Sequence, residues 1–205
     1  MTQRIFILPI WIRLWHWTNA ALMILLAISG ASMHFSGTGW GILRFETAVK
    51  IHNFCGVTLL WLYGLFILAN LFSGNLGRYL PEMKGFIGKS WKQIKFYCWG
   101  IFVGAPDPYE PTREASHNTL QQVMYWAVMY ILVPIVLISG AMFLWPNLAP
   151  KEVLGLDGLV PVALVHYVAG VVLFGFTLMH IYLGTTGHKI SSQFKTMVNG
   201  YHEME

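Results

Sequence analysis

Four long runs of apolar residues, separated by connections that contain polar residues, dominate the pattern of this 205-residue chain. A helix needs about 20 predominantly apolar residues to cross the hydrocarbon core of a bilayer, and each run reaches that length. The predicted spans are residues 10–33, 49–72, 120–145 and 160–183. The pattern therefore predicts an all-α membrane protein, a bundle of four transmembrane helices that forms a single domain over residues 1–205.

The third predicted span contains a proline inside its apolar run. Pro134 has no backbone N–H, so it cannot complete the regular helical hydrogen-bond pattern. We therefore expect a kink in this span, with the freed carbonyl group covered by the rest of the protein.

The basic residues are distributed unevenly over the connections. Ten of the thirteen Lys and Arg residues lie in or beside the N-terminal segment, the long second connection and the C-terminal tail, and three lie in or beside the two short connections. Cytoplasmic segments of membrane proteins carry an excess of Lys and Arg. Both termini and the long connection are therefore predicted to be cytoplasmic.

One stretch of the long connection, about residues 84–100, has a helical apolar stripe. The stripe consists of Ile87, Trp91, Ile94 and Cys98. Three lysines lie mostly off this stripe, which predicts an amphipathic helix on the inner membrane surface. The alternative is a solvated basic loop.

Composition agrees with a membrane location. The chain is 56% hydrophobic and 11% charged, whereas a soluble domain carries about twice as much charge. The net charge of +4 requires no nucleic-acid partner, because the basic residues sit where the membrane topology would place them.

Four histidines lie in the predicted spans or at their ends, where an ionisable side chain indicates a functional site by default. The fourth span contains both His166 and His180, which are fourteen positions apart. Over that length a helix brings the second side chain to within about 40° of the face of the first and about 21 Å further along the axis. The topology places His16 and His180 near the cytoplasmic surface. It places His52 and His166 near the outer surface, so each pair joins two helices at matching depth.

A very small residue follows each of these histidines by one helical turn. The four residues are Ala20, Gly56, Gly170 and Gly184. Since residues at i and i+4 share a helical face, the surface beside each imidazole is expected to be bare, as a flat iron macrocycle bound by imidazole requires. The alternative is four polar core histidines hydrogen-bonded between helices. The cysteines, Cys55 and Cys98, form no C-x-x-C-H motif, so covalent haem attachment is not indicated.

Several motifs resemble those of the four-helix di-haem cytochrome b family, the cytochrome b561-like membrane subunits of formate dehydrogenases, nickel–iron hydrogenases and thiosulfate or polysulfide reductases. The resemblance covers nearly the whole chain. Its motifs are Arg13-Leu14-Trp15-His16-Trp17, His52 with Gly56, the run from His117 to Trp126, His166-Tyr167-Val168-Ala169-Gly170 and His180-Ile181-Tyr182.

The resemblance implies two non-covalent b haems between the helices. In the family the matching histidines are the axial ligands of the haem irons. Here they would be His16 and His180 for the inner haem, and His52 and His166 for the outer haem.

The resemblance also implies a site for menaquinone or ubiquinone at the start of the third span, near the inner haem. The candidate residues are His117, Asn118, Gln121 and Gln122. Such side chains supply hydrogen-bond donors to the quinone carbonyls and a proton route to water. The alternative is that Asn118 or Thr119 caps the third span. Arg13 is a candidate partner for a haem propionate, with ordinary membrane anchoring as its alternative.

The expected function is that of a membrane-anchoring electron-transfer subunit in the bacterial cytoplasmic (inner) membrane, where it contacts the lipid bilayer and the quinone pool. The chain carries no Rossmann fingerprint, iron–sulfur cysteines or molybdenum-ligand motif. The substrate chemistry would therefore belong to an outer-face iron–sulfur, molybdenum, hydrogenase or multihaem cytochrome subunit. One alternative is a free-standing b-type cytochrome that exchanges electrons with a small diffusible molecule such as superoxide. Another is a non-redox membrane transporter or assembly protein.

Overall fold

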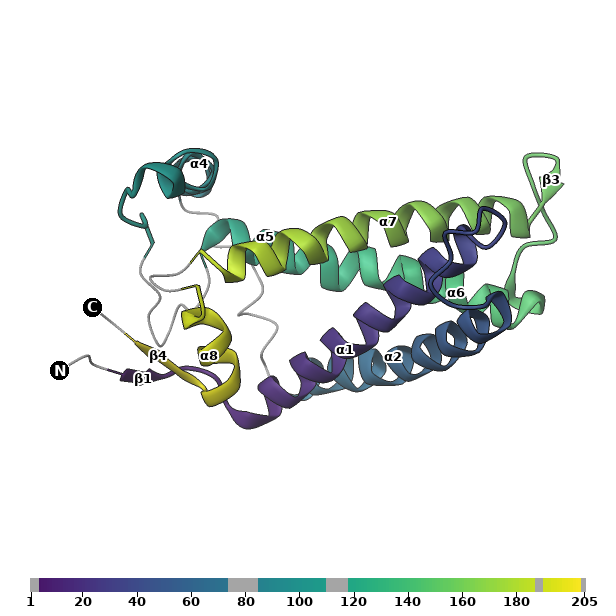
Figure 1. The fold of residues 1–205 in the computed structure, drawn as a ribbon, viewed down its shortest axis with the longest axis horizontal. Helices are drawn as coiled ribbons and strands as arrows, with labels where there is room; N and C mark the ends of the chain where they lie inside the picture. Colours follow the sequence, from purple (N-terminus) through teal and green to yellow (C-terminus); the bar gives the residue numbers. More distant parts are fainter. Residues whose placement is uncertain (1–3, 74–84, 110–117, 187–189, 204–205) are drawn as a thin grey trace. The chain divides into compact units, whose positions relative to one another are not determined.

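The computed structural model of the chain describes residues 4–73, 85–109, 118–186 and 190–203, and Figure 1 traces them. Within these residues, four helical segments are long and apolar enough to cross a membrane. They are α1 (Ile10–His34), α2 (Phe45–Ser73), the continuous segment of α5 (Thr119–Ala127), η2 (Val128–Leu132) and α6 (Val133–Leu144), and α7 (Leu159–Gly184). The prediction of an all-α protein with four spans is confirmed.

Helix α2 begins at Phe45, four residues before the predicted start at residue 49. Glu46 lies in its first turn, where a negative charge interacts favourably with the helix dipole. The Glu46 carboxylate also accepts a hydrogen bond from Lys50 Nζ at 2.8 Å, one turn further along the same face. These polar contacts extend the helix beyond its apolar run, which hydrophobicity alone does not reveal.

The third span is irregular in the turn before Pro134. Residues Val128–Leu132 form the π-helical turn η2, and α6 follows with the proline in its first turn. A proline leaves the carbonyl group four residues earlier without its usual partner. The π-helical turn is where the helix accommodates this interruption.

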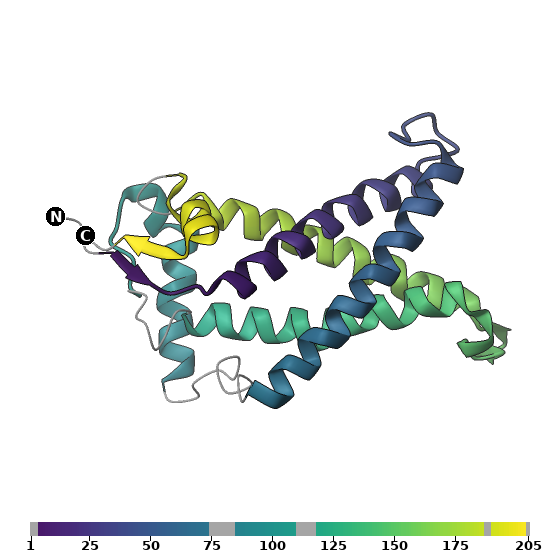
Figure 2. The same ribbon diagram turned by 90° about the horizontal axis from the view of Figure 1, so that it is seen from below.

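The chain divides into two compact units. Unit 2 comprises Leu14–Ala69 and Ile131–Thr177, and so contains most of α1, α2, α6 and α7. Figures 1 and 2 show its two connections, residues 35–44 and 145–158, at the same end of the unit. The second connection contains η3 (Pro146–Leu148) and the hairpin of β2 (Glu152–Val153) and β3 (Leu156–Asp157). Buried apolar residues of this unit are Leu22, Ala48, Cys55, Leu59, Phe66, Val133, Leu137, Ala169 and Leu173.

Unit 1 comprises Met1–Arg13, Asn70–Tyr130 and Leu178–Glu205, and so contains both ends of the chain. Strand β1 (Arg4–Phe6) pairs antiparallel with β4 (Tyr201–Glu203). The amide groups of Ile7 and Leu8 then donate to the Gly200 carbonyl at 2.9 and 3.2 Å. This pairing brings Arg4–Phe6 and Tyr201–Glu203 side by side, and the cytoplasmic location of both termini stays a prediction.

Unit 1 also contains the short helices α4 (Phe86–Cys98), η1 (Gly100–Val103) and α8 (Ser192–Asn199). Helix α4 occupies the stretch predicted to be amphipathic. Its polar residues Ser90 and Gln93 are buried against the protein, whereas Ile87 and Trp91 of the apolar stripe are exposed. An outward apolar face suits contact with lipid, and the position of α4 on the inner membrane surface stays a prediction.

Candidate functional site

Two of the predicted histidines lie close together in unit 2, with their rings in an edge-on arrangement. His52 is on α2 and His166 is on α7, and the centroids of their rings are 6.2 Å apart with an interplanar angle of 73°. Both side chains are half-buried. The structure therefore brings together the pair that membrane depth predicted for the outer surface.

A serine from a neighbouring helix contacts the Nδ1 atom of each ring. Ser29 Oγ on α1 is 3.0 Å from Nδ1 of His52, and Ser139 Oγ on α6 is 2.9 Å from Nδ1 of His166. Each of the four helices thus contributes one side chain to the site. Among the described residues, the structure shows no hydrogen bond to the Nε2 atom of either ring.

A glycine follows each serine and lets the ring approach the helix backbone. A Cβ atom at Gly30 would be 3.4 Å from Cε1 of His52, and one at Gly140 would be 3.1 Å from Cε1 of His166. The second distance is tighter than most contacts that Cβ atoms make in proteins. The two Ser-Gly pairs were not among the candidates from the sequence. The sequence signal that could have identified them is the Ser-Gly dipeptide that occurs in both the first and the third span.

The pair of rings fits the axial ligation of a haem iron. A metal–imidazole nitrogen bond is about 2 Å long, so two rings that bind one ion from opposite sides have centres roughly 6 Å apart. A Cβ atom at Gly56 or Gly170 would meet no atom within 4 Å, so the surface one turn beyond each histidine is open. The contacts between the histidines and the serines of other helices involve only Nδ1, so they leave Nε2 for a metal.

The other predicted pair is divided between the two units. His16 lies in unit 2 and His180 in unit 1, so the pairing of these two histidines stays a prediction. The surroundings of Gly184 differ from those of Gly56 and Gly170. A Cβ atom at Gly184 would be 3.5 Å from Cζ of Phe194 on α8, in the same unit.

Asn118 and Gln121, two of the four quinone candidates, form a capping box at the start of α5. Oδ1 of Asn118 accepts from the Gln121 amide at 2.8 Å, and Oε1 of Gln121 accepts from the Asn118 amide at 3.0 Å. Capping by Asn118, the structural alternative, is therefore observed. Gln122 is half-buried on α5, and His117 lies outside the described residues.

Tyr97 on α4 forms a polar cluster with the capping residues Asn118 and Gln121, and it was not among the candidates from the sequence. Its phenol oxygen accepts a hydrogen bond from Nδ2 of Asn118 at 3.0 Å. Burial raises the pKa of the Tyr97 phenol, and the Asp107 carboxylate adds to this effect. The phenol is therefore neutral near pH 7 and keeps its hydroxyl proton.

Arg13 anchors the C-terminal part of unit 1. Its Nη1 atom donates a hydrogen bond to the carbonyl group of Val198 in the last turn of α8. A cation at the C-terminal end of a helix interacts favourably with the helix dipole. This contact gives Arg13 a structural role inside unit 1, and its predicted role toward a haem propionate stays untested.

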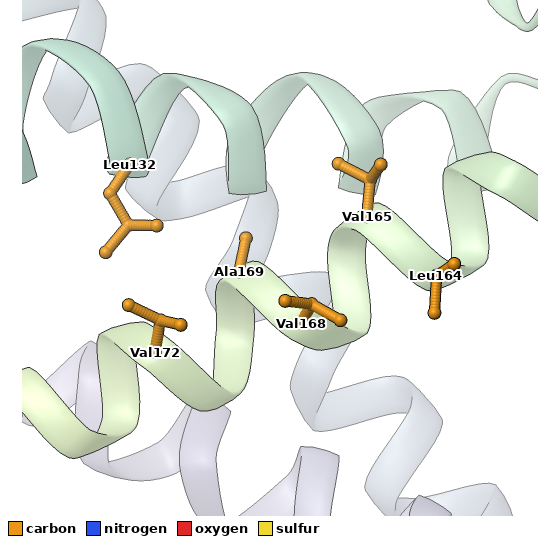
Figure 3. Close-up of a pocket in the computed structure, with 6 residues that line it drawn as sticks. All are labelled: Leu132, Leu164, Val165, Val168, Ala169 and Val172. Carbon is orange, nitrogen blue, oxygen red and sulfur yellow. The ribbon is translucent and has the colours of Figure 1, made fainter.

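An apolar groove of about 400 Å³ lies in unit 2, and Figure 3 shows the side chains that line it. They are Leu132, Leu164, Val165, Val168, Ala169 and Val172. All six are aliphatic and offer no hydrogen bond to a quinone carbonyl. The groove suits acyl or isoprenoid chains rather than a quinone head group.

Comparison with known proteins gives one family match and one curated relative. The family model for prokaryotic cytochrome b561 matches residues 7–200, a range that includes all four candidate spans. "Putative cytochrome YdhU" of Escherichia coli (strain K12) is 34% identical over 200 residues, which cover 98% of this chain and 75% of that protein. The chain belongs to the prokaryotic cytochrome b561 family, and it is a multi-pass membrane protein of electron transfer that binds b-type haem.

Proposed function

We propose that this chain is the membrane-anchoring subunit of a redox complex in the bacterial cytoplasmic membrane. In this role it carries electrons between a partner on the outer face and the membrane quinone pool. The observation that carries the proposal is the pair of imidazole rings, His52 and His166, with centroids 6.2 Å apart. The family membership supports the same chemistry.

His52 and His166 are the proposed axial ligands of the outer haem. The Nδ1 atom of each ring lies within hydrogen-bond distance of a serine hydroxyl on a neighbouring helix, so Nε2 is the atom proposed to coordinate the iron. Gly56 and Gly170 leave space beside the rings. A b haem supplies a site that takes up and releases one electron at a time.

His16 and His180 are the proposed ligands of a second, inner haem. The support is their matching depth in the first and fourth spans and their match to the family motifs. Both histidines lie toward the ends of their helices, near residue 10 of α1 and residue 184 of α7. The protein would then hold two non-covalent haems, and His residues of three helices would supply the axial ligands.

The proposed quinone site lies at the start of the third span and takes menaquinone or ubiquinone. Asn118 and Gln121 are engaged in capping α5, whereas Gln122 lies outside the capping box. His117 stays a candidate from the sequence. Tyr97 adds a neutral phenol to the polar cluster beside the cap. Protons for the quinone would come from the cytoplasm.

The proposed partner docks on the end of unit 2 that carries its two connections. Exposed apolar side chains there include Trp40, which is 83% exposed, and Leu154, which is 97% exposed. Arg44 and Lys151 lie in the same connections or beside them. An exposed apolar set with nearby charges is typical of a surface that binds another protein. The partner would be an iron–sulfur, molybdenum, hydrogenase or multihaem cytochrome subunit.

Replacing His52 or His166 by alanine tests the outer haem. Each variant is expected to lose one of two haems per chain, seen as a halved b-type absorption band in reduced-minus-oxidised spectra. His34→Ala is the matched control. His34 lies at the outer end of α1, and its ring stacks on that of Tyr167 with 5.0 Å between the ring centroids. Retention of both haems in His52→Ala and His166→Ala would refute the assignment.

Purification in mild detergent tests the partner. A companion chain that co-purifies and reduces or oxidises the haems supports the subunit role. A protein that is always isolated alone, yet exchanges electrons with superoxide, would instead be a free-standing cytochrome.

A further inference from the structure

We infer that Ser29 and Ser139 are positioning residues that hold His52 and His166 in the tautomer with the proton on Nδ1. Each ring then presents an unprotonated Nε2 to a metal. The inference rests on the proposed outer haem, since it concerns the atoms that would bind its iron. It goes beyond that proposal by assigning the two serines, which lie on helices that carry neither ligand.

The proton of the Ser29 hydroxyl is already committed to the backbone of α1. Its Oγ donates to the Leu25 carbonyl at 2.6 Å and lies 3.2 Å from the Leu26 carbonyl. A serine hydroxyl has a single proton to donate. Toward His52 the oxygen can therefore only accept, and Nδ1 of His52 must carry the proton.

Ser139 repeats the arrangement on α6. Its Oγ donates to the Ile135 carbonyl at 2.6 Å and lies 3.1 Å from the Val136 carbonyl. The contact of 2.9 Å to His166 is then a bond that Nδ1 donates to the serine oxygen. The two sites have the same donor direction.

A neutral imidazole carries one proton, so a proton on Nδ1 leaves a lone pair on Nε2. The hydrogen bond also raises the basicity of the coordinating nitrogen and fixes the orientation of the ring. Both serines are buried, with Ser29 0% and Ser139 4% exposed, so packing holds each hydroxyl rigidly beside its ring. Gly30 and Gly140 let the rings come within reach of the serines.

The test is redox titration of the full-length protein in detergent, followed by absorption spectra that resolve the two haems. Ser29→Ala and Ser139→Ala are expected to raise the midpoint potential of the outer haem, because a less basic ligand stabilises ferric iron less. They are also expected to lower the affinity of that site for haem by about 10-fold or more. The inner haem should titrate as in the wild type.

Ser32→Ala is the matched control. Ser32 is also buried on α1 and donates to the carbonyl four residues earlier, Ile28, at 2.7 Å, but its oxygen accepts from the Leu43 amide instead of a histidine. This variant should leave both potentials unchanged. Ser29→Thr and Ser139→Thr keep the hydroxyl and should restore the wild-type values.

The outcomes separate this inference from the proposed function. If alanine at either serine leaves the outer potential unchanged while His52→Ala still removes the outer haem, the positioning role is wrong and the haem assignment stands. If a serine variant loses the haem and threonine does not restore it, the role is likewise wrong. If the wild type keeps its outer haem after His52→Ala, the haem assignment itself fails.

Discussion

Asn118 donates a hydrogen bond from Nδ2 to the phenol oxygen of Tyr97 across 3.0 Å, and so joins the N-terminus of α5 to α4. The same side chain caps α5 through Oδ1. Asn118 is 5% exposed, and two of its polar groups are engaged inside unit 1. Its first role is therefore to fix the beginning of the third span.

Replacing Asn118 separates capping from quinone binding. Asn118→Ala should lower the free energy of unfolding by about 1 kcal/mol, because the cap is lost. Asn118→Ser keeps a capping oxygen and should unfold close to the wild-type temperature in thermal denaturation. Gln122→Ala lies outside the capping box and should reduce quinol oxidation without a change in stability. Loss of quinol oxidation in a stable Asn118→Ser protein would show that the amide binds quinone as well.

Larger side chains at Gly56 and Gly170 test whether a flat group lies beside the outer histidines. Gly56→Leu and Gly170→Leu introduce side chains into open space, so the polypeptide should remain folded. The outer haem should nevertheless be lost, as measured by haem content and reduced-minus-oxidised spectra. Gly64→Leu is the control. A Cβ atom at Gly64 would also meet no atom within 4 Å, and Gly64 lies on α2 away from His52. Equal haem content in all three variants would contradict the clearance role.

Because of Tyr97, we expect the folded protein to lose stability at alkaline pH. Burial raises the pKa of its phenol in the folded protein, whereas in the unfolded chain the value is about 10. The folded state therefore favours the neutral phenol, and this stabilisation is complete below the unfolded pKa and is lost as pH rises through the folded pKa. Tyr97→Phe should lower stability at neutral pH by about 1 kcal/mol.

The measurement is thermal unfolding of both proteins between neutral pH and pH 11. The wild type should lose stability more steeply than Tyr97→Phe above about pH 10. Parallel curves for the two proteins would contradict the assignment.

Replacing Arg13 tests whether the N-terminal segment stabilises helix α8. Arg13→Ala removes the hydrogen bond to the Val198 carbonyl and should increase amide hydrogen exchange in residues 190–203. Lys195→Ala, a change to an exposed cation on α8, is the control. An altered potential of one haem without faster exchange would favour the propionate role instead.

The spans were predictable because the bilayer requires long apolar helices, and few other segments have that property. The start of α2 was not, because its beginning contains the charged pair Glu46 and Lys50 and so interrupts the apolar run from which the span was predicted. The pairing of β1 with β4 could not be predicted either. Strands of three residues carry almost no pattern, and their partners are at opposite ends of the sequence.

The outer site was partly predictable for a similar reason. Depth in the membrane is set by position along a span, so the sequence alone matched His52 with His166. Ser29 and Ser139 were not recognised, because a serine bonded to its own helix backbone is common in transmembrane helices. The glycine that follows each of them is a weak signal, and the approach of a ring from another helix gives them a contact that Ser32 lacks.

The pairing of Arg4–Phe6 with Tyr201–Glu203 also constrains the order of folding during synthesis. The first strand leaves the ribosome long before its partner is made, and a chain is extended by about 5–20 residues per second. All four spans are complete before the last residues emerge. The two strands can therefore pair only after all four spans have been synthesised, and a chain truncated before residue 201 would enter the membrane without ever forming this pair.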